Sequence, residues 1–278
     1  KTTRYGKANV TQVVEKLRSI MKEQNFELSS EEESTLSHLQ QFLLSSETSK
    51  NYLLVTNNNR TAHLLLRMIT QLPEKSVFPA LDLTRLLVFQ TTAIIDQFTS
   101  LIDEIGTRFV DHWNELSMPT QLMVLRVYCN MFPPVFDAQL VVPRSVSIIT
   151  SEGFYSKLVD VISSSLTSKL EGVRLTAASL SSNLSLYTPK NGNDEETQLL
   201  CSMSEFLAEE SSNEVRTRML LTVYRICKDN SSAISLLKEL GYKFDIPSTS
   251  SSSGAATPQN NNSEARLLSA SIKQLLSQ

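Results

Sequence analysis

Residues 77–89 read Val77-Phe78-Pro79-Ala80-Leu81-Asp82-Leu83-Thr84-Arg85-Leu86-Leu87-Val88-Phe89, and this stretch has the pattern of one helix. Proline suits the first or second position of a helix, because its missing N–H would have no partner inside the helix there. Behind Pro79, leucines recur at helical spacing and give the stretch an apolar face. Arg85 falls at the edge of that face. The simplest interpretation makes it a surface residue paired with Asp82, one turn earlier.

The same periodicity recurs through the chain and is typical of an all-helical protein. The 278 residues are 41% hydrophobic, which is enough for one extended domain or two small ones. Only seven are glycine, and no segment alternates apolar and polar residues as a strand does. Residues 29–33 resemble an N-terminal helix cap. The spacing predicts helices over residues 10–21, 36–43, 62–72, 77–89, 101–116, 122–132, 154–166, 173–186, 199–207, 215–227, 233–240 and 265–276.

Charge and cysteine content narrow the class of protein. A net charge of -3 and a pI near 5.8 argue against general nucleic-acid binding, although the basic residues could still gather on one surface. The three cysteines, Cys129, Cys201 and Cys227, stand apart in apolar periodic segments. This pattern favours reduced, buried thiols in a reducing compartment, so we expect a cytoplasmic or nuclear location.

No motif in the sequence points to catalysis. His38, His63 and His112 fall in separate predicted helices, without the spacing of metal ligands. The chain has no nucleophile elbow, no phosphate-binding loop and no Cys-x-x-Cys pair. We therefore expect no catalytic residues, no metal and no cofactor. No apolar run approaches the length of a membrane span, so no membrane partner is expected. Because the chain begins at Lys1, we expect a piece of a longer protein, with any targeting signal outside it.

The composition changes near the end of the chain. Residues 247–263 are almost entirely serine, threonine, asparagine, glycine and proline, which predicts a disordered loop. Residues 264–278 are amphipathic again, so we expect a helix that packs back on the body as a cap. The alternative is a free helix that binds a partner.

Polar residues recur at one position of successive predicted helices. Arg85, Asn130, Asn183 and Arg225 align, at separations of 45, 53 and 42 residues. This period is close to the roughly 40–47 residues of armadillo and HEAT repeats. In such a repeat, the aligned residues would form a ladder along the concave side of a superhelix. An asparagine amide there can donate to and accept from the backbone of an extended peptide at once.

Two further arginines share helix faces with this ladder. Arg126 precedes Asn130 by four residues, and Arg218 precedes Arg225 by seven. Structural roles remain open for these positions. The asparagines could satisfy helix ends or carbonyl groups of the adjacent repeat, and Arg218 could pair only with Glu214.

Several blocks together resemble the PUL domain, named for phospholipase-activating protein and the yeast ubiquitin-fusion-degradation factors. The resemblance begins near Leu64 and continues to the end of the chain, with weaker similarity over residues 1–50. We expect one PUL armadillo-like domain over residues 1–278. The blocks are residues 78–86, residues 121–132, Thr176-Ala177-Ala178-Ser179-Leu180-Ser181-Ser182-Asn183, Glu214-Val215-Arg216-Thr217-Arg218-Met219-Leu220, residues 236–241 and the closing helix.

This resemblance implies an armadillo-like superhelix without catalytic activity. Its basic concave groove would bind the acidic, tyrosine-containing C-terminal tail of a hexameric AAA+ ATPase, valosin-containing protein. The domain would act as a monomeric adaptor in ubiquitin-dependent processes. Two alternatives are an armadillo or HEAT scaffold for another acidic peptide, and the non-catalytic module of a multidomain peptidase or thioredoxin-type protein.

The resemblance also assigns groove residues. Arg85 and Arg218 stand where the family has groove arginines, and Arg126, Asn130 and Asn183 follow as further groove residues. Arg225 rests on its repeat position alone. Exposed ion pairs contribute only about 0.2–1 kcal/mol each, so we expect micromolar binding that weakens as salt rises.

Overall fold

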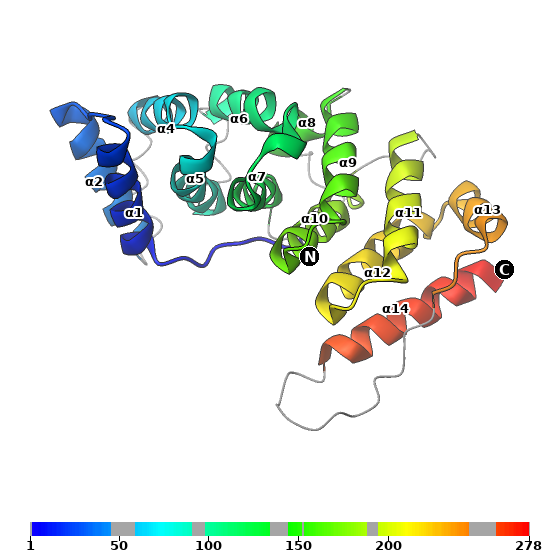
Figure 1. Cartoon of the computed structure of the whole chain (residues 1–278). Coiled ribbons are helices and arrows are strands. Elements are labelled where there is room, and N and C mark those ends of the chain that lie inside the picture. Colours follow the sequence, from blue (N-terminus) through cyan, green and yellow to red (C-terminus); the bar gives the residue numbers. More distant parts are fainter. Residues whose placement is uncertain are drawn as a thin grey trace. The chain divides into compact units, whose positions relative to one another are not determined.

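The computed structural model describes residues 2–45, 59–90, 98–133, 144–151, 153–187, 194–244 and 260–277. Every regular element in these residues is helical, which confirms the predicted all-α helical-repeat class (Figure 1). The α-helices are α1 (Val10–Glu23), α2 (Ser30–Leu44), α4 (Asn59–Gln71), α5 (Phe78–Gln90), α6 (Thr99–Ile105), α7 (Met118–Asn130), α8 (Arg144–Ile149), α9 (Phe154–Ser165), α10 (Glu171–Leu184), α11 (Asp194–Leu207), α12 (Asn213–Cys227), α13 (Ser231–Leu240) and α14 (Asn260–Ser277).

The chain divides into two compact units, Lys1–Phe154 and Tyr155–Gln278. In the first unit, α5 and α7 lie side by side, α1 packs on α5, and α4 contacts both α2 and α6. In the second unit, α12 lies between α10 and α14, and α11 packs on α12. Helices about 45 residues apart in the sequence are thus neighbours, as stacked repeats require.

Local sequence signals set many of the helix ends. Pro79 is the second residue of α5, as expected from its missing N–H. Ser29 and Glu32 form a capping box at the start of α2, which confirms the predicted cap. At the end of α13, Gly241 adopts the left-handed conformation with φ 66°, which glycine tolerates best.

The predicted helix over residues 101–116 is confirmed as helical only as far as Val110, and it is not one regular α-helix. The helix α6 ends at Ile105, a π-helical turn follows over Gly106–Val110, and a short 3-10 turn spans Trp113–Glu115. A side chain at Gly106 would lie 2.8 Å from the ring of Phe154, so this turn packs closely beneath that ring. The helix α8, at the end of the first unit, was not predicted.

The last helix starts earlier than expected. It begins at Asn260, so the final four residues of the predicted 247–263 loop are helical, while residues 247–259 lie outside the described residues. It packs against α12 and α13. All three cysteines are free; Cys129 and Cys227 are buried as predicted, whereas Cys201 is partly exposed.

Candidate functional site

The residues before α1 form an extended segment, residues 2–9, called the leading segment below. It runs along α5 and α7 within the first unit, as the blue trace that leaves α1 in Figure 1. The Arg4 guanidinium donates from Nη2 to the carbonyls of Phe89 at 2.6 Å and Asn130 at 3.2 Å, at the ends of the two helices. It also lies 4.5 Å from the centre of the Phe89 ring. Burial lowers the pKa of Arg4 to about 10.

Asn130 holds the middle of the leading segment. Its Oδ1 accepts from the Tyr5 N–H at 2.6 Å, and its Nδ2 donates to the Tyr5 carbonyl at 2.8 Å. The same Nδ2 donates to the Arg85 carbonyl at 2.8 Å, so Asn130 and Arg85 are neighbours at the repeat position that aligned them. Asn130 therefore binds the extended backbone of the chain itself, and its bond to the Arg85 carbonyl matches the structural alternative in which it satisfies a carbonyl of the adjacent repeat.

Arg85 is buried, so its interpretation as a surface residue is wrong. Only 2% of it is exposed, and its Nε forms the predicted ion pair with Asp82. Its Nη1 donates to the Tyr5 carbonyl at 2.7 Å, and its Nη2 donates to the Lys7 carbonyl at 3.1 Å. Burial raises the pKa of Asp82 even though the Arg85 charge opposes that shift. The arginine is thus engaged on three sides by its own chain.

Arg126 lies on α7 beside this cluster, and it is only half-buried. Its guanidinium carbon is 5.1 Å from the centre of the Tyr5 ring, a distance typical of a cation–π contact. Its Nε is shielded from solvent and has no hydrogen-bond partner. No described residue forms an ion pair or hydrogen bond with the Arg126 side chain, and besides the ring its charge acts only at longer range, where it favours the ionised form of Asp82 and so lowers the pKa of that carboxyl.

In the second unit, two arginines share one face of α12. Arg218 is half-buried, and its Nε is likewise shielded without a partner. In the described part of the chain, Arg218 does not form the alternative ion pair with Glu214. Arg225 donates from Nη1 to Ser182 of α10, reaching the carbonyl at 2.5 Å and Oγ at 2.8 Å. Burial, and secondarily the Arg218 charge, lowers the pKa of Arg225 to about 10. Asn183 is fully buried in α10.

The six predicted groove residues thus divide into two sets. In the first unit, Arg85, Arg126 and Asn130 all contact the leading segment. In the second unit, Arg218 and Arg225 lie on α12 and Asn183 is buried in the neighbouring helix α10. The sequence analysis missed Arg4 and Tyr5. Nothing in the periodicity identified them, because the leading segment is not helical and its partners lie 80 or more residues away.

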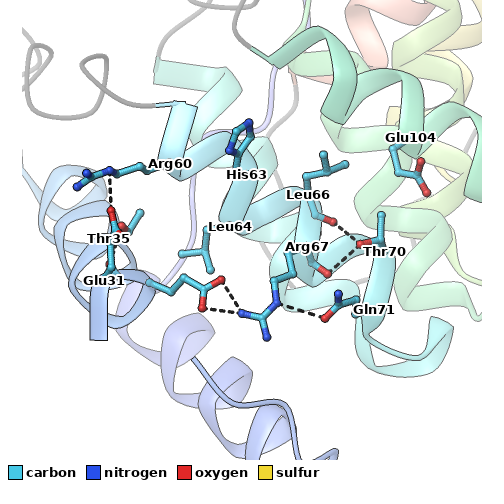
Figure 2. Close-up of a pocket in the computed structure, with 11 residues that line it drawn as sticks. Glu31, Thr35, Arg60, His63, Leu64, Leu66, Arg67, Thr70, Gln71 and Glu104 are labelled. Atoms are coloured by element: carbon cyan, nitrogen blue, oxygen red, sulfur yellow. Dashed lines mark hydrogen bonds and ion pairs between the residues drawn. The ribbon is translucent and has the colours of Figure 1, made fainter. Parts of the chain in front are cut away.

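A separate cavity of about 660 Å³ opens between α2, α4 and α6 (Figure 2). Its charged side chains are largely paired with each other. Arg67 donates from Nη1 to both oxygens of Glu32, at 2.5 and 2.6 Å, and Arg60 pairs with Glu31 at 2.8 Å. The described residues contain no cluster of three potential metal ligands, and none of their helices is long and apolar enough to cross a bilayer.

A comparison with known families identifies the domain. The family model of the PUL domain matches residues 1–267, which nearly cover both units. The match includes the leading segment, which lies in the part where the sequence showed only weaker similarity, and it ends inside α14. PUL domains are protein-interaction modules. This chain belongs to the PUL domain family.

Proposed function

We propose that this domain is a non-catalytic adaptor that binds the acidic, tyrosine-containing C-terminal tail of the AAA+ ATPase valosin-containing protein. Family membership supports a role in protein interaction. The arginines of the two units support the choice of an acidic ligand. The tail would connect the ATPase to ubiquitin-dependent processes through the protein that carries this domain.

One observation carries the proposal. Arg126 and Arg218 each hold a guanidinium Nε away from water with no hydrogen-bond partner in the described residues. Leaving a charged donor buried and unsatisfied costs about 1–3 kcal/mol or more. A ligand carboxylate relieves that cost, because it accepts two parallel charge-assisted hydrogen bonds from a guanidinium. A neutral carbonyl also accepts a hydrogen bond, but it does not balance the positive charge.

The contacts of the other candidates limit what they contribute. Arg85 and Asn130 are occupied by the leading segment, and Arg225 is bound to Ser182. Arg126 is therefore the residue of the first unit to which we assign a carboxylate of the tail, and Arg218 is the corresponding candidate in the second unit. Lys7 and Lys16, both exposed beside a cavity of about 320 Å³, add positive charge to the first unit.

The test is a titration of a labelled tail peptide into the domain, followed by fluorescence anisotropy. We expect saturable binding with a Kd in the micromolar range, and a Kd about tenfold higher for Arg126→Ala and for Arg218→Ala at low salt. The matched control is Arg60→Ala, an exposed arginine on α4 that already has an acidic partner. It should bind like the wild type.

A second peptide separates charge from shape. It carries asparagine and glutamine in place of every aspartate and glutamate of the tail, with the tyrosine kept. If it binds as tightly as the acidic tail, the arginines do not select carboxylates and the assignment is wrong. If neither peptide binds to a folded domain, the tail is not the ligand, and a scaffold for another acidic peptide becomes the better account.

A further inference from the structure

We propose that Arg85 and Asn130 are positioning residues, which serve tail binding by holding the leading segment under Arg126. This inference rests on the proposed function. It changes the role of Arg85, which the family resemblance places among the residues that contact the ligand directly. The argument depends on what these two side chains touch and on what the leading segment presents.

The first step concerns accessibility. The polar atoms of Asn130 are fully buried, and the hydrogen bonds of its side chain go to Tyr5 and Arg85. Arg85 is 2% exposed, with Asp82 on Nε and carbonyls of the leading segment on both terminal nitrogens. Arg85 lines the cavity of about 320 Å³ beside Lys7 and Lys16, but only 2% of its surface is exposed, so it offers a ligand carboxylate little of its guanidinium while the leading segment is in place. Asn130 is closed to a ligand altogether.

The second step concerns convergence. The Tyr5 carbonyl accepts from both Arg85 Nη1 and Asn130 Nδ2, while the Tyr5 N–H donates to Asn130 Oδ1. Both polar groups of one backbone residue are therefore fixed by these two side chains. The residue fixed in this way is the one whose ring lies against the Arg126 guanidinium.

The third step concerns the effect of the Tyr5 ring on the Arg126 guanidinium, the group to which we assign a ligand carboxylate. Arginine has a long side chain that loses considerable rotamer entropy when it is held in one place. The Tyr5 ring restricts the Arg126 guanidinium before any ligand arrives, so less entropy is lost on binding. Releasing the leading segment removes that restriction, and the affinity for the tail falls although Arg126 itself is unchanged.

Gly6 offers a way to release the segment without altering α5 or α7. A Cβ at this position would lie 2.4 Å from the Phe89 ring, which is far closer than carbon atoms can approach. Gly6→Ala therefore forces either the partly exposed Phe89 ring or the segment to move while Arg85, Asn130 and Arg126 all remain, and the cleavage rate of this variant reports whether the segment is released. It serves as the second variant if Arg85→Ala, which removes a buried side chain, disturbs the helices.

The experiment measures segment docking and tail affinity on the same samples. Trypsin cleaves after Lys7 when the segment is released, and the loss of residues 1–7 is followed by mass spectrometry. Cleavage of a transiently opened segment tracks the open population. Two charge-assisted hydrogen bonds hold the segment through Arg85, so trypsin should cleave Arg85→Ala after Lys7 about 10- to 100-fold faster than it cleaves the wild type. Gly6→Ala should behave likewise, and both variants should bind the tail at least fivefold more weakly.

Two variants serve as controls: Arg126→Ala, which lacks the proposed ligand contact, and Arg60→Ala, which should behave like the wild type. Arg126→Ala should lose affinity with little change in cleavage, because it removes the ligand contact but no hydrogen bond to the segment. The inference is overturned if Arg85→Ala loses affinity while its Lys7–Ala8 bond stays as resistant as in the wild type, since Arg85 then contacts the ligand. It is also overturned if a released segment leaves affinity unchanged. Absence of tail binding by the wild type rejects the proposed function instead, and the cleavage rates still report whether Arg85 holds the segment.

Discussion

Replacing Asn130 by alanine tests how strongly the leading segment is coupled to the helices. The substitution removes three hydrogen bonds, two to Tyr5 and one to the Arg85 carbonyl, with lengths of 2.6 to 2.8 Å. Each contributes about 1 kcal/mol net, so the free energy of unfolding should fall by about 3 kcal/mol. In a unit of 150 residues or more, 1 kcal/mol shifts Tm by about 2–4 °C. We therefore expect Tm to fall by about 6–12 °C.

Differential scanning calorimetry measures this change, and hydrogen exchange followed by mass spectrometry locates it. The expected loss of protection includes the leading segment and the last turns of α5 and α7. The matched control is Gln121→Ala, another amide on α7, whose Nε2 makes a single 3.0 Å hydrogen bond to the Trp113 carbonyl. This control should cost only about 1 kcal/mol. The reasoning is refuted if Asn130→Ala is no more destabilising than Gln121→Ala.

Three other predictions concern acid stability, a helix end and the core. Burial alone would raise the pKa of Glu210, but hydrogen bonds from Arg174 and from the Ser212 backbone lower this pKa below the ordinary 4.5. The stability that the Glu210 carboxylate adds is therefore present above about pH 4.5 and is lost as the pH falls further. When the free energy of unfolding in urea is measured at a series of pH values, Glu210→Gln should weaken its decrease at acid pH. Gly241→Ala places a side chain at φ 66° and should cost about 1 kcal/mol, visible as faster hydrogen exchange at the end of α13. Leu17→Ala removes a fully buried side chain of α1 and should cost about 2–5 kcal/mol in chemical denaturation, whereas exposed Leu44→Ala should cost less than about 1 kcal/mol.

The helices were predictable because their signals are local. Pro79 at the start of α5 and the capping box at Ser29 each act within one turn of the chain. In the predicted helix over residues 101–116, the structure changes to a π-helical turn at Gly106, against the ring of Phe154 about 50 residues further on. Apolar spacing continues through that region, so periodicity alone could not locate the break.

For the candidate site, the sequence predicted which residues are near each other better than it predicted what their side chains contact. The repeat spacing correctly placed Arg85 beside Asn130, and the asparagine does bind an extended backbone. The source of that backbone was not predictable, since residues 2–9 carry no pattern that points to helices 80 to 130 positions away. The exposure of Arg85 was mispredicted for the same reason, because the leading segment is what buries it. Whether the arginines bind an ATPase tail stays a prediction.

The path of the leading segment has a consequence for the order of events during synthesis. Its residues leave the ribosome before α5 and α7, and two of the carbonyls that Arg4 and Thr2 contact belong to Asn130 and Pro133. At roughly 5–20 residues per second, those partners are made about 6–25 s later. Over that interval the segment has no completed surface to bind, and both Arg4 and Tyr5 are open to chaperones and proteases. Its docking is therefore a late step, which follows the formation of α7.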